Sequence, residues 1–180
     1  MGRLKLATVW LGGCSGCHMS FLDLDEFLID LAEQADVVYT PIIDVKEYPE
    51  GVDVALVEGA IANEEHLAMI RRVRSRTRVL VSFGDCAVTG NVTALRDPLG
   101  SAEPVLRRSY IDLADLQPQI PREAGIVPVL LDRVTPVHNV VPVDLYLPGC
   151  PPPAARIRAV LEQVLAGGPV HLEGRDIKFG

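Results

Sequence analysis

Four cysteines constrain this chain more than any other feature of its sequence, because each lies in a glycine-containing loop directly after an apolar run. Glycine there lets the backbone adopt a positive φ angle and approach a bulky group closely. Since thiolates ligate zinc and iron–sulfur clusters, the repetition predicts that these loops converge on one metal centre. The cysteines are Cys14 and Cys17, which follow 4–11, Cys86, which follows 78–83, and Cys150, which follows 143–147.

Apolar runs of strand length alternate with amphipathic segments, a rhythm that predicts βαβ units and a mostly parallel sheet flanked by helices, the α/β class. Right-handed crossovers place the loops that follow the strands at one edge, where ligands of such sheets bind. The cysteine loops and Glu58 are expected at that carboxyl edge. Strands are predicted over 4–11, 36–39, 52–59, 78–83 and 143–147, and helices from an N-cap at Ser20 to about 34, from an N-cap at Asn63 to the arginines before 78, and from 151 to about 165.

Length and composition indicate a single domain, 1–180, with one face against a partner. The 180 residues are long enough for one sizeable core and short for two. Hydrophobic residues make up 48% of the chain and its mean hydropathy is +0.23, which is apolar for a chain that covers its own surface. Residues 97–142 are interrupted by prolines and lack clear periodicity, so we predict that they form part of an interface.

Charge and hydropathy exclude several function classes. The net charge of −7 argues against nucleic-acid binding, which needs a basic surface. No run approaches the ~20 apolar residues of a membrane span, and no signal peptide is recognisable. The chain is therefore expected in the cytoplasm, without a membrane partner. Thiols stay reduced in the cytoplasm, so its cysteines are expected to be ligands more readily than disulfides.

The spacing of the cysteines favours an iron–sulfur cluster over zinc. Zinc sites usually take two close pairs, whereas here one close pair, Cys14 and Cys17, accompanies two distant single cysteines. A cubane cluster is larger and can gather ligands from separate loops. A structural zinc site remains an alternative, as does a thioredoxin-like redox pair that leaves two cysteines unexplained. The glycines expected to leave room for the sulfides and to aim backbone N–H groups at them are Gly13, Gly16, Gly84 and Gly149.

No complete catalytic constellation accompanies the cysteines. The glycine-rich stretch 12–16 lacks a Walker lysine and the dinucleotide spacing, and no serine lies in a nucleophile elbow. His18 adjoins the cysteine loop, where it is a candidate for tuning the centre or passing a proton. Glu58 is a candidate proton carrier or anchor for a partner's loop, with a capping or solvated carboxylate as the alternative. A metal centre without chemistry of its own is best explained as an electron relay.

Four motifs, taken together, resemble the small subunit of [NiFe] hydrogenases. They occur in the order found in that family and span nearly the whole chain. The resemblance implies a flavodoxin-like fold that holds one [4Fe-4S] cluster on Cys14, Cys17, Cys86 and Cys150. It also implies a large subunit that carries the Ni–Fe site, so that no catalytic residue belongs to this chain. The motifs are Cys14-x-Gly16-Cys17, Glu58-Gly59-Ala60-Ile61, Gly84-x-Cys86-Ala87 and Pro148-Gly149-Cys150-Pro151-Pro152.

The stretch 17–26 most resembles the short small subunit of cytoplasmic NAD-reducing (bidirectional) [NiFe] hydrogenases. Membrane-bound and periplasmic small subunits carry a leader and two further clusters, which these 180 residues do not show. The related subunit of respiratory NADH:quinone oxidoreductase has adjacent cysteines, whereas two residues separate Cys14 from Cys17. The resemblance implies diaphorase partner subunits with flavin and further clusters, and reversible H₂ oxidation coupled to NAD⁺ reduction. Sulfur-reducing and F420-linked cytoplasmic hydrogenases, a zinc module of another complex and a free flavoprotein are alternatives.

Overall fold

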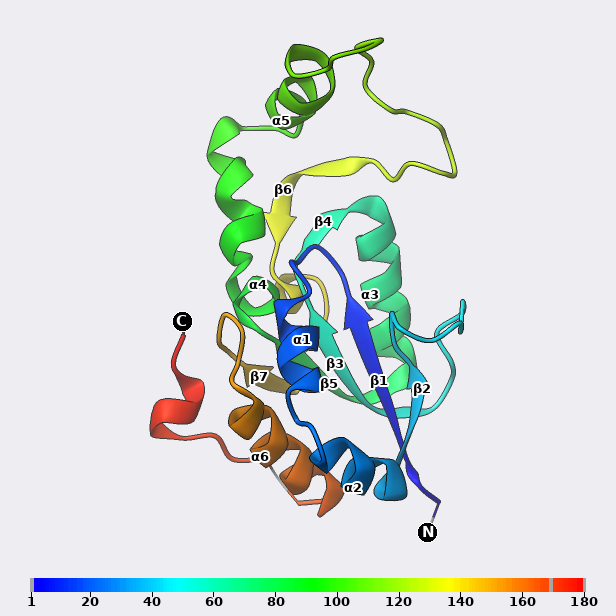
Figure 1. Cartoon of the computed structure of the whole chain (residues 1–180), viewed down its shortest axis with the longest axis vertical. Coiled ribbons are helices and arrows are strands. Elements are labelled where there is room, and N and C mark those ends of the chain that lie inside the picture. The colour runs from blue at the N-terminus through cyan, green and yellow to red at the C-terminus, as the bar shows by residue number, and fades with distance from the viewer. Residues whose placement is uncertain (1, 169, 180) are drawn as a thin grey trace.

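One sheet of five parallel strands organises the described part of the chain, residues 2–168 and 170–179 of a computed structural model (Figure 1). The strands stand in the order β2-β1-β3-β5-β7, and every neighbouring pair is parallel. When only these five strands are counted, this is the 2-1-3-4-5 order of flavodoxin-like sheets. The predicted α/β class and its mostly parallel sheet are therefore confirmed. The strands are β1 Leu4–Trp10, β2 Ala35–Tyr39, β3 Val52–Glu58, β5 Thr77–Phe83 and β7 Leu145–Leu147.

The register of the sheet aligns the carboxyl ends of four strands. Trp10 lies level with Glu58, Glu58 with Phe83, and Phe83 with Leu147. Each loop that carries a predicted thiol ligand therefore leaves the sheet from the same row of residues. Because parallel strands with right-handed crossovers all end at one edge, the expected placement of these loops and of Glu58 is realised.

Helices cover both faces of the sheet, which explains why the strands are apolar at nearly every position. Leu6 and Leu56 pack toward α1, α2 and α6, whereas their neighbours Ala7 and Val57 pack toward α3. No helix in the described ranges is long and apolar enough to cross a membrane. The helices are α1 Gly16–Leu22, α2 Phe27–Gln34, α3 Glu64–Arg76, α4 Asp85–Thr89, α5 Glu103–Arg107 and α6 Ala154–Leu165.

The predicted single helix over 20–34 is wrong in its start and in its continuity. α1 already begins at Gly16, and it is separated from α2 by a turn in which Asp25 has a φ of 48°. Ser20 is therefore inside α1 and is not its N-cap. Its buried hydroxyl donates a hydrogen bond to the carbonyl oxygen of Pro152 at 2.6 Å. A contact across the fold thus uses the hydroxyl that the local pattern assigned to capping.

Residues 91–135 form an arm that extends beyond the sheet, coloured green to yellow in Figure 1. The arm leaves α4 through the 3₁₀ helix Asn91–Leu99 and returns through β6, Leu130–Thr135, which pairs antiparallel with β4, Ile61–Asn63. Asn63 also caps α3 as predicted, because its side chain accepts a hydrogen bond from the backbone N–H of His66 at 2.7 Å. The remaining short helical segments are the π-helix Arg108–Asp112 and the 3₁₀ helices Val137–Asn139 and Gly174–Ile177.

Two polar contacts fasten the base of the arm. The Arg96 guanidinium donates to the Leu131 carbonyl oxygen at 2.5 Å, and an Asp97 carboxylate oxygen accepts from the Val134 N–H at 2.9 Å. Large apolar side chains are exposed along the arm, as is typical of protein–protein contact surfaces. This exposure supports the expectation that 97–142 is partly an interface. The exposed side chains are Val92, Leu95, Leu99, Tyr110, Leu113, Leu116, Ile126, Val127 and Val129.

Tyr48 anchors the otherwise exposed loop between β2 and β3. Its fully buried ring packs against Tyr39 with the ring centroids 5.1 Å apart. Its hydroxyl forms a hydrogen bond of 2.6 Å with the Thr77 hydroxyl at the start of β5. Burial is the main reason that the pKa of Tyr48 is raised to about 12, so the folded state strongly favours the neutral phenol.

Tyr48→Phe is expected to lower the free energy of unfolding at neutral pH by about 1 kcal/mol, because the buried hydrogen bond to Thr77 is lost. It should also weaken the alkaline loss of stability. The raised pKa means that the stability contributed by the neutral phenol is present below about pH 10 and is lost between about pH 10 and 12. This loss amounts to about 1.4 kcal/mol per pH unit in the wild type.

Urea unfolding at pH 7 and at several values between about 9 and 11.5 measures both effects. Tyr39→Phe is the matched control, since it alters the neighbouring ring but leaves the Tyr48 hydroxyl in place. An alkaline slope that is the same in Tyr48→Phe and the wild type would contradict the prediction.

Candidate metal centre

Three loops bring the four cysteines to the carboxyl edge of the sheet. Cys14 and Cys17 follow β1, with Cys17 in the first turn of α1. Cys86 lies in the first turn of α4, directly after β5, and Cys150 lies between β7 and α6. Figure 1 shows that the beginnings of α1 and α4 and the loop before α6 share this end of the sheet.

The four thiols are close enough to affect one another's ionisation. Burial raises the pKa of the Cys17 thiol, and negative charge on Glu58, Cys86, Cys14 and Cys150 raises it further. The pKa of Cys86 is likewise raised, first by burial and then by Cys14 and Cys150. Both thiols are therefore held protonated in the protein alone, and a bound metal centre would supply the positive charge that four thiolates require.

The four cysteines differ in their exposure to solvent. Cys17 is buried, Cys86 is half-buried, and Cys14 and Cys150 are exposed. All four are free thiols, and none of them forms a disulfide. A group held by all four would be anchored against the sheet through Cys17 and would reach the surface beside Cys14 and Cys150.

Two of the predicted glycines leave space for sulfur. Gly84 has a φ of +82°, and a Cβ at this position would lie only 2.2 Å from the Cys17 sulfur. A Cβ on Gly16 would lie 3.2 Å from the Cys14 sulfur. A side chain at Gly84 would fill the space that the thiol occupies, so the donor set and the room beside it fit a group ligated by sulfur.

The other two predicted glycines lie where the nearby backbone leaves little room for a side chain. Gly149 has a φ of +138°, and a Cβ there would lie 2.5 Å from the Pro152 Cα. A Cβ on Gly13 would lie 3.2 Å from the Gly59 Cα and 3.3 Å from a carboxylate oxygen of Glu58. Gly149 therefore permits a tight turn within its own loop, and Gly13 permits the close approach of the loops after β1 and β3.

Asp85 links two of the cysteine loops and was missed by the sequence argument. Its buried carboxylate accepts a hydrogen bond from the Gly149 N–H at 2.6 Å, and its own N–H donates to the Gly149 carbonyl at 2.9 Å. Since Asp85 precedes Cys86 and Gly149 precedes Cys150, this pair of hydrogen bonds sets the spacing of the two thiols. The available signal was an acidic residue beside a cysteine after an apolar strand.

Glu58 and His18 meet inside the protein beside the Cys17 loop. Glu58 is 1% exposed, and its carboxylate accepts from the His18 N–H at 3.0 Å and also contacts the His18 ring nitrogen Nδ1. The other ring nitrogen is 3.0 Å from the Thr8 hydroxyl, which donates to the Thr40 hydroxyl at 2.8 Å. The carboxylate thus holds the start of α1 in place, and the solvated alternative for Glu58 is wrong.

The thiols do not converge on a single point. Within 2–168 and 170–179, no three His, Cys, Asp or Glu side chains are grouped closely enough to hold one metal ion. The choice between zinc and an iron–sulfur cluster therefore rests on the spacing of the cysteines in the sequence, where one close pair accompanies two distant single cysteines.

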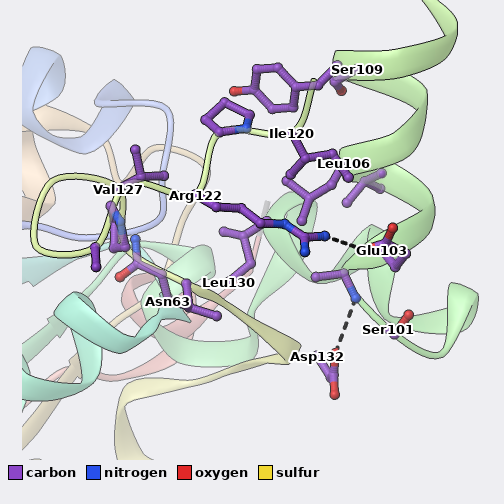
Figure 2. Close-up of a pocket in the computed structure, with 17 residues that line it drawn as sticks. Asn63, Ser101, Glu103, Leu106, Ser109, Ile120, Arg122, Val127, Leu130 and Asp132 are labelled. Atoms are coloured by element: carbon purple, nitrogen blue, oxygen red, sulfur yellow. Dashed lines mark hydrogen bonds and ion pairs between the residues drawn. The ribbon is translucent and has the colours of Figure 1, made fainter. Parts of the chain in front are cut away.

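A cavity of about 810 Å³ lies in the arm, away from the cysteines. Figure 2 shows mainly apolar side chains of α5, of the segment before β6 and of the start of β6 around it, among them Leu106, Ile120 and Leu130. Arg122 and Glu103 form an ion pair of 3.8 Å at its side. The cavity contains no cysteine or histidine among its lining residues, so it is separate from the candidate metal centre.

Comparison with known proteins places the chain among redox subunits. Residues 14–164 match the family described as NADH ubiquinone oxidoreductase, 20 Kd subunit. A subunit of the F420-non-reducing hydrogenase of Methanothermobacter marburgensis is 36% identical over 97% of this chain and 58% of its own length. The NAD-reducing hydrogenase HoxS subunit delta of Cupriavidus necator is 35% identical over 95% of this chain and 83% of its own length. The chain thus spans little more than half of the Methanothermobacter relatives it matches.

Solved structures agree with the sequence relatives. A chain of an NAD⁺-reducing [NiFe]-hydrogenase in the H₂-reduced state superposes with a TM-score of 0.93 at 36% identity, covering 99% of this chain and 100% of that one. A chain of the [NiFeSe]-hydrogenase of Dm. baculatum superposes with a TM-score of 0.60 at 17% identity, covering 98% of this chain and 69% of that one, which shows a shared fold.

Asp85→Ala is expected to lower the free energy of unfolding by about 1–3 kcal/mol, because the buried Gly149 N–H loses its acceptor. It should also lower the metal content of anaerobically purified protein, since the Cys86 and Cys150 loops are then joined by the backbone hydrogen bond alone. Denaturant unfolding and metal analysis measure the two effects.

Asp97→Ala is the matched control for this variant. It removes a similar carboxylate–backbone hydrogen bond, to Val134, from the base of the arm. It should lower stability but leave the metal content unchanged. Equal metal contents in the two variants would show that Asp85 has no special role at the centre.

Proposed function

We propose that this chain, which belongs to the NADH ubiquinone oxidoreductase 20 Kd subunit family, is an electron-transfer subunit. Within that family it is a small subunit of the [NiFe] hydrogenase type. In this proposal it carries electrons between the Ni–Fe site of a large subunit and a diaphorase module through one [4Fe-4S] cluster. The complex would catalyse reversible H₂ oxidation coupled to NAD⁺ reduction in the cytoplasm.

The observation that carries the proposal is the meeting of four free thiols at one edge of the sheet. Cys14, Cys17, Cys86 and Cys150 would hold the cluster, and charge on the other three thiols already acts on Cys17. A bound [4Fe-4S] cluster accepts and releases single electrons. The protein's part is to present the four thiols from three loops at this edge and to keep Cys17 in a buried setting.

Exposed apolar side chains around the cysteine loops support a large-subunit interface at this edge. Trp10 ends β1, Met19 lies in α1, and Val92 and Leu95 follow the Cys86 helix, all with exposed side chains. Contiguous apolar surface on a protein marks a site of association. A partner that covers this surface would bring its own centre close to the outer thiols, which shortens the electron path. It would also exclude water from these thiols, which lowers the local dielectric constant.

The electron acceptor is proposed from the relatives. The NAD-reducing HoxS subunit delta and the NAD⁺-reducing hydrogenase structure support NAD⁺ as the acceptor. The flavin-containing diaphorase between the cluster and NAD⁺ is part of the proposal. The relatives from F420-non-reducing hydrogenases are equally similar in sequence, and the Sulfhydrogenase 2 subunit delta of Pyrococcus furiosus is 30% identical. The Coenzyme F420 hydrogenase subunit gamma of Methanosarcina barkeri is 31% identical. The small subunit of a sulfur-reducing or F420-linked cytoplasmic hydrogenase is therefore the second candidate.

Anaerobic purification of the native complex tests the proposal. The chain should contain about four iron and four sulfide per polypeptide, with a reduced [4Fe-4S] signal in electron paramagnetic resonance. Companion chains should include a hydrogenase large subunit and a flavoprotein, and H₂ should reduce NAD⁺. Stoichiometric zinc without iron would refute the relay, whereas H₂ oxidation without NAD⁺ reduction would favour the second candidate.

Cys150→Ser is expected to lower iron content or convert the cluster, because a hydroxyl replaces one of four thiolate ligands. Electron flow from H₂ to NAD⁺ should fall at least about tenfold, as is common when a ligand environment is altered. Nickel in the large subunit should be retained. Iron and nickel analysis with H₂-dependent NAD⁺ reduction measures these effects, and a fully active variant with four irons would exclude Cys150 as a ligand.

A further inference from the structure

We propose that Asn91 sets the reduction potential of the cysteine-bound centre by donating a hydrogen bond to the Cys150 sulfur. The inference rests on the proposed function, since it assumes that Cys150 ligates an electron-carrying cluster. The Asn91 side-chain amide nitrogen lies 3.4 Å from the Cys150 sulfur, within hydrogen-bond range for sulfur. Asn91 lies 59 positions from Cys150 in sequence, so the contact is made by the fold and not by a local turn.

The backbone at Asn91 is held in a conformation that most residues avoid. Asn91 has a φ of +34° directly after Gly90, whose φ is +87°. Asparagine is one of the few residues besides glycine that tolerates this left-handed region. Non-glycine residues in such conformations cluster at functional sites, where the surrounding structure over-determines them. Here the turn directs the amide toward an exposed thiol.

Asp85 holds both partners of this hydrogen bond. The Thr89 hydroxyl donates to the Asp85 carbonyl at 2.9 Å and lies 3.3 Å from the Asn91 N–H, which donates to it. The Asp85 carboxylate in turn accepts from the N–H of Gly149, the residue before Cys150. One buried residue thus fixes the position of the donor and of the acceptor, so the contact is built into the loop framework.

A hydrogen bond from an amide N–H to a ligand sulfur stabilises negative charge on a cluster. The reduced state carries one more negative charge than the oxidised state and is therefore stabilised more, which raises the reduction potential. The effect grows where a partner subunit excludes water from the outer thiols. Asn91 acts in this way through Cys150 and touches no substrate, so it is a positioning residue.

Two substitutions separate the hydrogen bond from the loop conformation. Asn91→Asp keeps the size of the side chain and its tolerance of the left-handed region, but replaces the amide donor with a negative charge. Asn91→Gly removes the side chain and fits the same backbone conformation. Gln34→Glu is the control, because it adds the same charge at the exposed end of α2, at the opposite edge of the sheet.

The test is a redox titration of the anaerobically purified native complex, with the [4Fe-4S] signal followed by electron paramagnetic resonance. Both Asn91 variants should shift the midpoint potential downward, Asn91→Asp further than Asn91→Gly, with iron content unchanged, while Gln34→Glu matches the wild type. Unchanged potentials in both variants, or loss of iron without a shift in the remaining signal, would overturn the inference. Absence of the signal from the wild-type complex would instead refute the proposed function.

Discussion

The register of the parallel sheet is the constraint on which the rest of the structure depends. It places the last residues of β1, β3, β5 and β7 in one row, so that loops far apart in the sequence begin side by side. The hydrophobic covering of both faces holds that register, because a shift by one residue would turn the buried side chains of a central strand to the wrong layer. The meeting of the thiols follows from this packing.

Burial, with repulsion among the thiols, keeps Cys17 and Cys86 protonated in the protein without a bound metal. Both effects raise the pKa of Cys17 and of Cys86, so these free thiols resist the ionisation that ligation requires. In the proposed function, a positively charged iron–sulfur core would offset that cost. The three cysteine loops are already joined to one another by hydrogen bonds within the protein. These are the Asp85–Gly149 pair and the Ser20–Pro152 hydrogen bond.

The groups that would hold a metal centre are partly buried, whereas the groups that would face a partner are exposed. Cys17 and the Glu58–His18 contact lie inside the protein, whereas Cys14, Cys150 and the apolar side chains around them face outward. The arm continues this exposed apolar surface beyond the sheet. The proposed relay would use both parts, because electron transfer between two centres requires that they lie close together.

The sequence alone determined the α/β class, the five strands of the parallel sheet, the N-cap at Asn63 and the four candidate ligands, because strand periodicity, capping and glycine-flanked cysteines are local patterns. It did not predict the pairing of β4 with β6, which lies outside that sheet. Only the tertiary structure decided that α1 begins at Gly16, that Gly13 lies against Gly59, and that Asp85 and Asn91 form hydrogen bonds with the Cys150 loop. Each of these depends on contacts between segments far apart in the chain. No local pattern encodes such contacts, because the partner of a polar group is chosen by how the loops pack and not by its neighbours in sequence.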